Sequence, residues 1–420
     1  MRYGRKHYAH MGATVNDEHV RSLVSYIARG AVPRSEYVFG VEIEHLPIRN
    51  GTGAAVDLYS ENGVEDFLRA LRPRFEPEEE TWENGHLLGL RRGKIDVSTE
   101  PGAQVETALG PVKSPAEAEE LYAQFRTLAD PILTELNFDL VPYGYQPRTP
   151  HSDVRILPTG RYRVLDEYFG TVGSYGLLMM RCSASTQVSI DFSSEADSVR
   201  KMRLGSAAGP LLGWFFRNSP YFESGPSPLP LMRQEMWERT DPQRTGLTPG
   251  LFSDGFGWED YAVNMLSTPL MVADMGGTPE HEGREKVFTV WHENAADIYP
   301  DRALNDYEMA HILSTHFNDV RLKQFLEFRH WDSLPIDRVR RLMEIVESLF
   351  CDDAQLDRLQ HLLGGVREVD VLAAKADIQA NGAQARPYGR SLEQWCELLG
   401  IRESDETDAF CYKLTNDGYA

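Results

Sequence analysis

The chain has 420 residues, of which 41% are hydrophobic and 25% are charged, and it carries a formal net charge of −21 at pH 7. That composition is typical of a globular protein with a substantial core and excludes wholesale disorder. The acidic excess argues against a sequence-independent grip on nucleic acid and against binding to an acidic membrane surface, and every uncharged stretch is far shorter than the roughly 20 residues that span a bilayer.

The N-terminal segment, residues 1–35, is expected to be an extension ahead of the main domain. Arg2, Arg5 and Lys6 are not followed by an apolar run, so no secretory signal is expected and cytoplasmic residence is the expectation. The cysteines are sparse and form no C-x-x-C pair, which disfavours a disulfide framework and a zinc site. They are Cys182, Cys351, Cys396 and Cys411.

The first informative element is the segment Val41-Glu42-Ile43-Glu44. Alternation along a strand sends Val41 and Ile43 to one face and both carboxylates to the other. A half-solvated antiparallel sheet alternates in the same way, so this segment alone does not distinguish a site from a wet surface.

The second element runs from Glu100 to Glu106 and contains a Pro-Gly pair, which predicts a turn or bulge with Glu100 at its start. After the turn, Gln104 and Glu106 are expected to point together, opposite Val105. A further pair of acceptor side chains therefore joins the polar set.

A helix is predicted to begin at Ser114-Pro115-Ala116-Glu117, where a capping Ser, a first-turn Pro and a Glu three residues on precede an apolar stripe. Another apolar stripe, over residues 336–349, has helical spacing and is expected to face the core. Neither helix carries chemistry.

Residues 151–250 hold 11 Lys or Arg against 10 Asp or Glu, a net charge of +1, whereas the rest of the chain carries −22. A locally basic region in an acidic protein suits a small polyanion such as a nucleotide or a dicarboxylate. Ordinary surface ion pairs would produce the same count, and both interpretations stay open.

Two later strands repeat the alternating pattern. In the first, Gln187, Ser189 and Asp191 line one face while apolar residues line the other. In the second, Glu327 and Arg329 share a face, which places an acid and a cation side by side. One sheet would gather all four polar segments.

Several acids on one sheet face repel one another unless a cation neutralises them. Mg²⁺ is the expected cation, because it takes oxygen ligands shared with substrate phosphates and the sequence has no cluster of Cys or His to compete. Arg329 is then placed to bind a phosphate, with a plain ion pair to Glu327 as the alternative. His311 and His316 are interpreted as ordinary histidines, and Cys182 has no neighbouring base to make it a nucleophile.

Eight segments of the chain form an ordered set of motifs: Gly40-Val41-Glu42-Ile43-Glu44, residues 98–106 with the pattern Glu-Pro-Gly-x-Gln-x-Glu, Pro158-Thr159-Gly160-Arg161-Tyr162, Met179-Met180, and residues 187–197, 240–246, 254–258 and 321–329. In order and spacing these motifs resemble those of the glutamate-cysteine ligases of the plant and proteobacterial type, over roughly residues 36–335. The resemblance implies an α+β fold, with a curved antiparallel β-sheet funnel flanked by helices, of the glutamine synthetase-like kind.

The resemblance also implies a reaction and its participants. ATP and Mg²⁺ phosphorylate the γ-carboxylate of L-glutamate, and the amine of L-cysteine then attacks to give γ-glutamylcysteine, the first step of glutathione biosynthesis. Small molecules are the only partners implied. The implied metal ligands are Glu42, Glu44, Glu100, Glu106, Gln187 and Glu327. The implied nucleotide-binding residues are Gln187, Ser189, Asp191 and Arg329, the substrate-binding residues are Arg161, Tyr162, Arg233, Trp237 and Arg244, and the catalytic residues are Glu42, Glu100, Glu327 and Arg329.

The sequence departs from the family pattern at His330-Trp331, where small residues are usual, and these rings are expected to reshape the acceptor pocket. A γ-glutamyl ligase with a different amine acceptor is therefore the main alternative. A non-catalytic binding protein on the same scaffold and a metal-dependent phosphohydrolase are two others. The domain organisation expected is a catalytic domain over residues 36–350, followed by a helical region over 351–420 packed on it.

Overall fold

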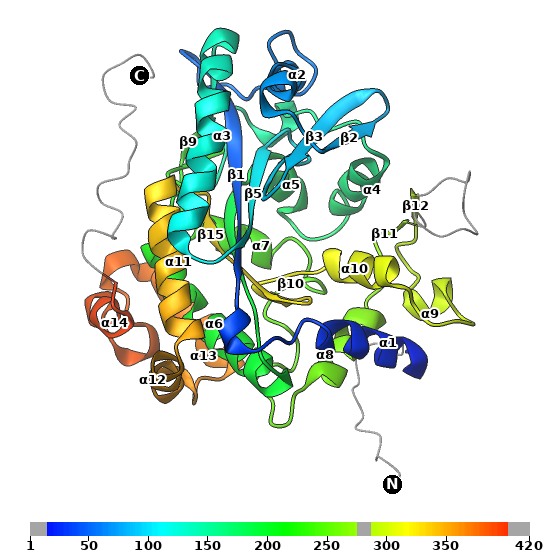
Figure 1. The fold of residues 1–420 in the computed structure, drawn as a ribbon. Helices are drawn as coiled ribbons and strands as arrows, with labels where there is room; N and C mark the ends of the chain where they lie inside the picture. Colours follow the sequence, from blue (N-terminus) through cyan, green and yellow to red (C-terminus); the bar gives the residue numbers. More distant parts are fainter. Residues whose placement is uncertain (1–14, 275–286, 402–420) are drawn as a thin grey trace.

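The computed structural model describes residues 15–274 and 287–401, and a large antiparallel sheet forms its centre (Figure 1). Within these ranges the sheet has nine strands in the order β14-β15-β7-β1-β5-β4-β3-β2, with β6 paired to the C-terminal half of β1. The antiparallel sheet flanked by helices that the sequence predicts is confirmed, and over the described residues the sheet is open. Its strands are β1 (Phe39–Arg49), β2 (Glu79–Glu83), β3 (His86–Arg92), β4 (Ile95–Thr99), β5 (Val105–Val112), β6 (Phe138–Val141), β7 (Ser185–Ile190), β14 (Val320–Leu322) and β15 (Leu326–Asp332).

The helices surround this sheet. Three short two-stranded ribbons, β8-β9, β10-β13 and β11-β12, lie among the segments that connect the helices. The helices are α1 (Asp17–Ala28), α2 (Val64–Phe75), α3 (Pro115–Leu136), α4 (Gly160–Phe169), α5 (Gly176–Cys182), α6 (Glu195–Phe215), α7 (Met232–Glu238), α8 (Trp258–Ser267), α9 (Ala295–Ile298), α10 (Asp306–Ser314), α11 (Ile336–Cys351), α12 (Asp353–Leu363), α13 (Glu368–Asn381) and α14 (Leu392–Leu399). The ribbon strands are β8 (Tyr221–Phe222), β9 (Gly225–Pro226), β10 (Thr245–Gly246), β11 (Val272–Asp274), β12 (Val287–Thr289) and β13 (Phe317–Asn318).

The side chains of strand β1 point alternately to the two faces of the sheet. Phe39, Val41 and Ile43 are at most 4% exposed and join the main hydrophobic core, whereas Glu42 and Glu44 lie on the opposite face. Helices α3 and α11 lie side by side along the core face, as Figure 1 shows, and α6 packs there against β15. The carboxylates are left on the face toward α4, α5 and α10.

The two helices predicted from their apolar stripes are confirmed. Helix α3 begins after Ser114, whose hydroxyl accepts a hydrogen bond from the Glu117 N–H at 3.2 Å. Helix α11 begins at Ile336 and buries the predicted stripe, from Val339 to Leu349, in the core.

Helix α6 lies close to the sheet because glycines face it. A Cβ at Gly205 would lie 2.4 Å from the Phe328 ring, and a Cβ at Gly209 would lie 2.4 Å from Cδ2 of His330. Glycine spacing of one helical turn therefore makes room for the rings of β15.

The ends of the described chain pack on the same core. In α1, Leu23 and Ile27 are fully buried, so part of the segment expected as an N-terminal extension contributes to the core. At the other end, α12, α13 and α14 add Leu356, Ile378 and Trp395 to it. Cys411 lies outside the described residues. In the described ranges no helix is long and apolar enough to cross a membrane.

Candidate active site

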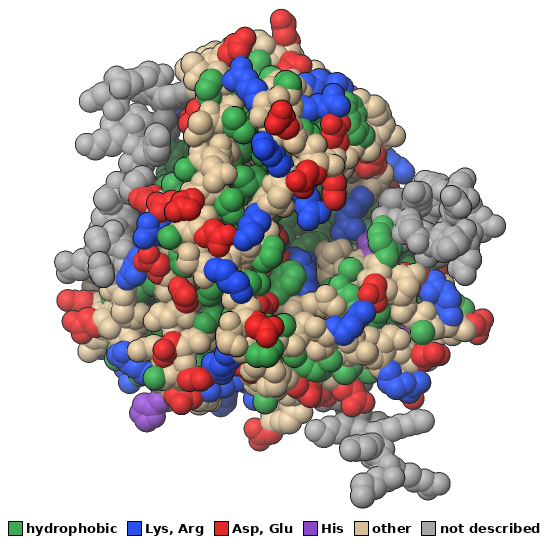
Figure 2. Space-filling model, viewed as in Figure 1, with side chains coloured by type: hydrophobic (Ala, Val, Ile, Leu, Met, Phe, Trp, Pro, Cys, Tyr) green, Lys and Arg blue, Asp and Glu red, His purple; other side chains and the backbone are tan. Residues whose placement is uncertain are grey.

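A cavity of about 260 Å³ opens on the polar face of the sheet, and we call it the acidic cavity. Figure 2 shows the corresponding face of the molecule hollowed near its centre, with Lys and Arg side chains at the rim. The sheet supplies one wall and α4, α5, α7 and α10 supply the others. Its lining includes Glu42, Glu44, Glu100, Glu106, Gln187, Arg321 and Arg329 from the sheet and adjoining turn, and Arg161, Tyr162, Met179, Met180, Trp237, Ser314 and Phe317 from the surrounding elements.

Strand register brings the acids together. Glu42 lies opposite Gln187 on β7, and Glu44 lies opposite Glu106 on β5. Glu100 precedes a tight turn in which its backbone N–H donates to the Gln104 carbonyl at 2.8 Å. The Gln104 side chain accepts a hydrogen bond from the Gly102 N–H in this turn. Its amide nitrogen donates to backbone carbonyls at the C-terminal end of α5. The turn thus presents Glu100 to the cavity.

Three of these carboxylates make no ion pair within the described residues. Among the described residues, the carboxylates of Glu42 and Glu100 have no hydrogen-bond or ion-pair partner, and Glu106 accepts only a 3.5 Å contact from Ser98 Oγ. Burial and then the Glu44 and Glu42 charges raise the pKa of Glu100 to about 7. Burial and neighbouring acids likewise raise the pKa of Glu42 and, strongly, of Glu106. Ionising these acids together is therefore unfavourable unless a further cation enters the cavity.

Glu44 and Gln187 are already engaged. The Glu44 carboxylate accepts from the Ser185 N–H at 2.7 Å and from the Gln187 amide at 3.1 Å. The Gln187 amide oxygen accepts a hydrogen bond from Arg329. Gln187 therefore links an acid of the cavity to a cation.

Glu327 lies beneath the cavity rather than in its lining. Its fully buried carboxylate pairs with Arg321 at 2.6 Å, Lys323 at 3.0 Å and Arg329 at 3.1 Å. Burial opposes the ionised form, but these three cations lower the pKa of Glu327 well below its usual range. Glu327 thus orients the guanidinium groups that reach the cavity.

A second wall holds Arg161 and aromatic groups. Arg161 lies in the first turn of α4 and donates to His311 Nδ1 and Ser314 Oγ, both at 3.2 Å. Burial and then the Glu100 charge raise the pKa of Tyr162 well above its usual value, so its hydroxyl stays protonated. The indole N–H of Trp237 is buried and has no acceptor within the described chain. This wall therefore offers N–H groups that make no hydrogen bond within the described chain.

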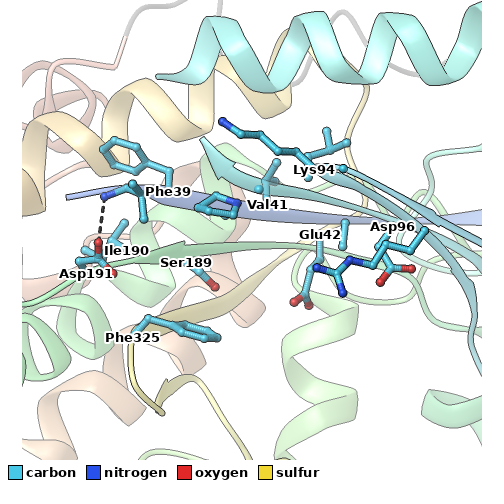
Figure 3. Close-up of a pocket in the computed structure, with 17 residues that line it drawn as sticks. Phe39, Val41, Glu42, Lys94, Asp96, Ser189, Ile190, Asp191 and Phe325 are labelled. Atoms are coloured by element: carbon cyan, nitrogen blue, oxygen red, sulfur yellow. Dashed lines mark hydrogen bonds between the residues drawn. The ribbon is translucent and has the colours of Figure 1, made fainter. Parts of the chain in front are cut away.

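A neighbouring cavity of about 340 Å³ lies along the same sheet face, and we call it the Phe325 cavity. It shares Glu42 with the acidic cavity and is also lined by Ser189, Asp191 and Phe325. In Figure 3 the Glu42 and Ser189 side chains point to the side of the sheet on which the Phe325 ring lies. The Asp191 carboxylate accepts from the Val38 N–H at 2.9 Å. The two cavities together place Ser189, Asp191 and the acids along one path.

Two of the expected substrate-binding arginines are not in the lining of the acidic cavity. Arg233 is buried and donates to the Arg329 carbonyl at 2.8 Å. Arg244 is fully buried, pairs with Asp241 at 3.0 Å, and donates to the Pro269 carbonyl. Both side chains brace the surrounding structure in this conformation.

The rings expected to reshape the acceptor pocket lie elsewhere. His330 and Trp331 contact Phe328 on the core side of β15, and neither lines the acidic cavity. A register shift between Phe328 and Trp331 accompanies this placement.

Burial raises the pKa of the Cys182 thiol to about 12, which suits an inert core residue.

Sequence reasoning missed Arg321, Lys323, His311 and Phe325. The alternation Arg321-Leu322-Lys323 was a usable signal, because it puts both cations on one face beside Glu327. His311 and Phe325 had no such signal, since Arg161 and the other residues that line the Phe325 cavity are distant in the sequence.

The donor set suits a hard cation. Oxygen ligands dominate the acidic cavity, and the described residues contain no ready-made group of three Asp, Glu, His or Cys side chains for a metal. Mg²⁺ usually takes only one or two protein carboxylates and completes its shell with water and substrate phosphates. An acid-lined cavity without a closed coordination cage fits that behaviour.

Comparisons with known proteins give a consistent result. The model of glutamate-cysteine ligase family 2 matches residues 38–394. A chloroplastic glutamate-cysteine ligase of Arabidopsis thaliana is 33% identical over 347 residues, which cover 81% of this chain and 64% of that protein. The chloroplastic ligase A of Oryza sativa subsp. japonica is 32% identical over 352 residues, covering 81% of this chain and 68% of that protein. The chain thus spans about two thirds of the length of these relatives.

A solved structure has the same fold. The crystal structure of a glutamate-cysteine ligase from Francisella tularensis in complex with AMP matches with a TM-score of 0.52 and 9% sequence identity. The match covers 86% of this chain and 76% of that one. At this identity the likeness concerns the fold.

Proposed function

Because the chain belongs to glutamate-cysteine ligase family 2, we propose that it is an ATP- and Mg²⁺-dependent ligase that phosphorylates the γ-carboxylate of L-glutamate and joins it to the amine of L-cysteine. The product would be γ-glutamylcysteine, in the first step of glutathione biosynthesis. The observation that carries the proposal is one cavity in which Arg161 and Arg329 lie with acids that make no ion pair among the described residues. Such a site binds a metal-bound polyanion and an anionic amino acid together.

Magnesium binding is assigned to the acids Glu42, Glu100 and Glu106, one or two of which would hold each ion, with Glu44 beside them. Burial and mutual repulsion raise the pKa of all three acids, and a bound cation would favour their ionised form, which supports the assignment. When bound, Mg²⁺ neutralises charge on ATP and on the transferring phosphoryl group. Gln187 and Glu327, expected from the sequence to be metal ligands, are instead assigned to hold Arg329, which both contact.

The nucleotide is assigned to the Phe325 cavity, with its phosphates directed across Glu42. Gly40 and Ala108, whose side chains are absent or small, line that end of the cavity, and the Phe325 ring lies on the same side of the sheet. A cavity lined by small residues and an aromatic ring suits a purine. Ser189 and Asp191 line the same space and can hydrogen-bond a sugar or base. The Francisella tularensis structure, which carries AMP, has this fold.

Glutamate is assigned to the wall that holds Arg161, Tyr162 and Trp237. The unspent N–H groups of Arg161 and Trp237 match a carboxylate, which accepts hydrogen bonds only. The second carboxylate of the substrate then lies toward Arg329, whose charge stabilises the negative charge that develops during phosphoryl transfer. No protein nucleophile is required.

The acceptor is assigned to the apolar side of the acidic cavity. Leu165, Phe169, Met179, Met180 and Phe317 line it, and a small thiol side chain suits such a surface. His330 and Trp331 motivated a different amine, but neither lines the cavity. Cysteine therefore remains the proposed acceptor.

The test is phosphate release from MgATP with glutamate alone, with glutamate plus cysteine, and with glutamate plus other amines, followed by mass analysis. Release that needs glutamate and cysteine, with the mass of γ-glutamylcysteine, would support the proposal. A preference for another amine would keep the ligase chemistry and replace the acceptor. Release without glutamate would indicate a phosphohydrolase, and ATP binding without turnover would indicate a binding protein.

Cytoplasmic residence stays a prediction, since the plant relatives named above are chloroplastic. Small molecules are the only partners proposed.

A further inference from the structure

Arg161 is held by two side chains from α10, a helix that sequence reasoning left without chemistry. Its Nη1 lies 3.2 Å from His311 Nδ1, and its Nη2 lies 3.2 Å from Ser314 Oγ. The imidazole is buried and its other nitrogen, Nε2, lies 2.8 Å from the Val272 carbonyl oxygen on β11. His311 thus bridges β11 and the cavity arginine.

The partners determine the tautomer of His311. A backbone carbonyl only accepts and a guanidinium only donates, so Nε2 carries the proton and Nδ1 offers its lone pair to Arg161. Ser314 is oriented in the same way, because its hydroxyl donates to the His311 carbonyl at 2.7 Å and leaves a lone pair for Arg161. Both side chains present acceptors to one guanidinium.

These contacts leave some guanidinium N–H groups of Arg161 without a hydrogen-bond acceptor among the described residues. A guanidinium has five N–H donors, and two of them are used here. The remaining three have no partner among the described residues, and Arg161 lines the acidic cavity. A planar fork fixed on one side and open on the other is prepared for a carboxylate.

We propose that His311, assisted by Ser314, is the positioning residue that orients Arg161 toward the carboxylate of the amino-acid substrate. This inference rests on the proposed ligase function. It assigns His311 no contact with substrate, so its loss should weaken glutamate binding and leave the nucleotide requirement unchanged. A purely structural histidine, tying α10 to β11, would instead affect stability alone.

Two substitutions separate these roles. In His311→Gln the amide nitrogen lies near the position of Nε2, so the Val272 contact can be kept while the acceptor for Arg161 is lost. In His311→Asn the amide oxygen lies near the position of Nδ1, so the Arg161 contact can be kept while the Val272 contact is lost. We expect the KM for glutamate to rise about tenfold in His311→Gln, as for a lost hydrogen bond to a charged group, and to change by less than about threefold in His311→Asn.

The KM for MgATP should stay within about twofold of wild type in both variants, and the midpoint of thermal unfolding should fall further in His311→Asn. Ser314→Ala should raise the glutamate KM in the same direction. Ser267→Ala is its matched control, because Ser267 also donates to a carbonyl three residues earlier, that of Asn264, but is absent from the cavity lining.

Direct binding of L-glutamate, measured by calorimetry on the full chain, makes the outcomes distinct. Wild-type turnover with an unchanged glutamate KM and Kd in His311→Gln would overturn the positioning role and leave the ligase proposal intact. Equal losses in the Gln and Asn variants that follow unfolding would also overturn it. A wild-type chain that neither binds glutamate nor turns over with it would overturn the ligase proposal and this inference together.

Discussion

Glu100 combines a raised pKa with the absence, among the described residues, of a partner for its carboxylate. Its folded-state pKa of about 7 lies above the ordinary value of 4.5. Between these values the folded chain binds more protons than the unfolded chain, so this group lowers stability as the pH rises through that window. The site therefore keeps an unfavourable charge, as expected where a cation is to bind.

Glu100→Gln should accordingly stabilise the metal-free protein and abolish turnover. Measured in EDTA, the thermal midpoint of the variant should exceed that of wild type more at pH 8 than at pH 5, because the repulsion it removes exists only when Glu100 is ionised. At limiting Mg²⁺ the activity of the wild type should fall as the pH drops below about 7, because protons then compete with the metal for Glu100. Glu347→Gln is the control, since burial also raises the pKa of Glu347, which lies on α11 outside the cavity. An equal gain at both pH values would contradict the assignment.

Glu327→Gln should lose both stability and activity. The substitution leaves Arg321, Lys323 and Arg329 without their shared buried carboxylate, and breaking a buried ion pair typically costs about 3 kcal/mol or more. Urea unfolding in EDTA and phosphate release measure the two effects. If Glu327 were only a metal ligand, stability in EDTA would be unchanged and turnover alone would be lost.

At the scale of elements, the alternating pattern predicted which face each side chain takes. It could not predict register, which is what brings Glu42 beside Gln187 and Glu44 beside Glu106. Alternation also could not predict on which face of the sheet His330 and Trp331 lie, because the register shift after Phe328 interrupts the alternation.

Distant contacts explain the other differences between expectation and structure. Arg244 was expected to bind substrate from its motif, yet it is buried against Asp241 and the Pro269 carbonyl. The sequence pattern gives His311 no role, and its contact with Arg161 could not be predicted because the two residues are 150 positions apart. The acidic strands could thus be predicted from the sequence. The positions of the cations that complete the site depend on tertiary packing and could not.

Gly209→Ala tests the close approach of α6 to β15. Alanine favours a helix by about 1 kcal/mol over glycine, but its Cβ would lie 2.4 Å from the His330 ring, which is enclosed by Phe328 and Trp331. Overpacking of this kind costs about 1–3 kcal/mol, so the variant should be less stable. The same change made in a His330→Ala background should be neutral or stabilising. Destabilisation of equal size in both backgrounds would mean that His330 is not the obstacle.

At the scale of the molecule, the helices after residue 351 are proposed to fold as one unit with the sheet. Their buried side chains join the core that β1 and α1 also enter. Lys375 on α13 adds a polar connection, since its nearly buried ammonium pairs with Glu238 at 2.5 Å and Asp319 at 2.8 Å. Glu238 ends α7, which carries Trp237, and the Asp319 carbonyl accepts the Arg329 N–H. The C-terminal helices are therefore linked to both walls of the acidic cavity.

Lys375→Met should then affect the site from a distance. It keeps most of the unbranched side chain but leaves two carboxylates without their buried cation, so we expect a loss of about 3 kcal/mol together with reduced turnover. Hydrogen exchange in urea should show α13 and β15 opening together in wild type, because one core and one ion-pair network join them. Arg367→Met, which removes the exposed pair with Asp370 at the start of the same helix, should change neither property. If α13 opened well before β15, and turnover survived the loss of Lys375, the C-terminal helices would form a separate unit and the site would depend on residues before 351 alone.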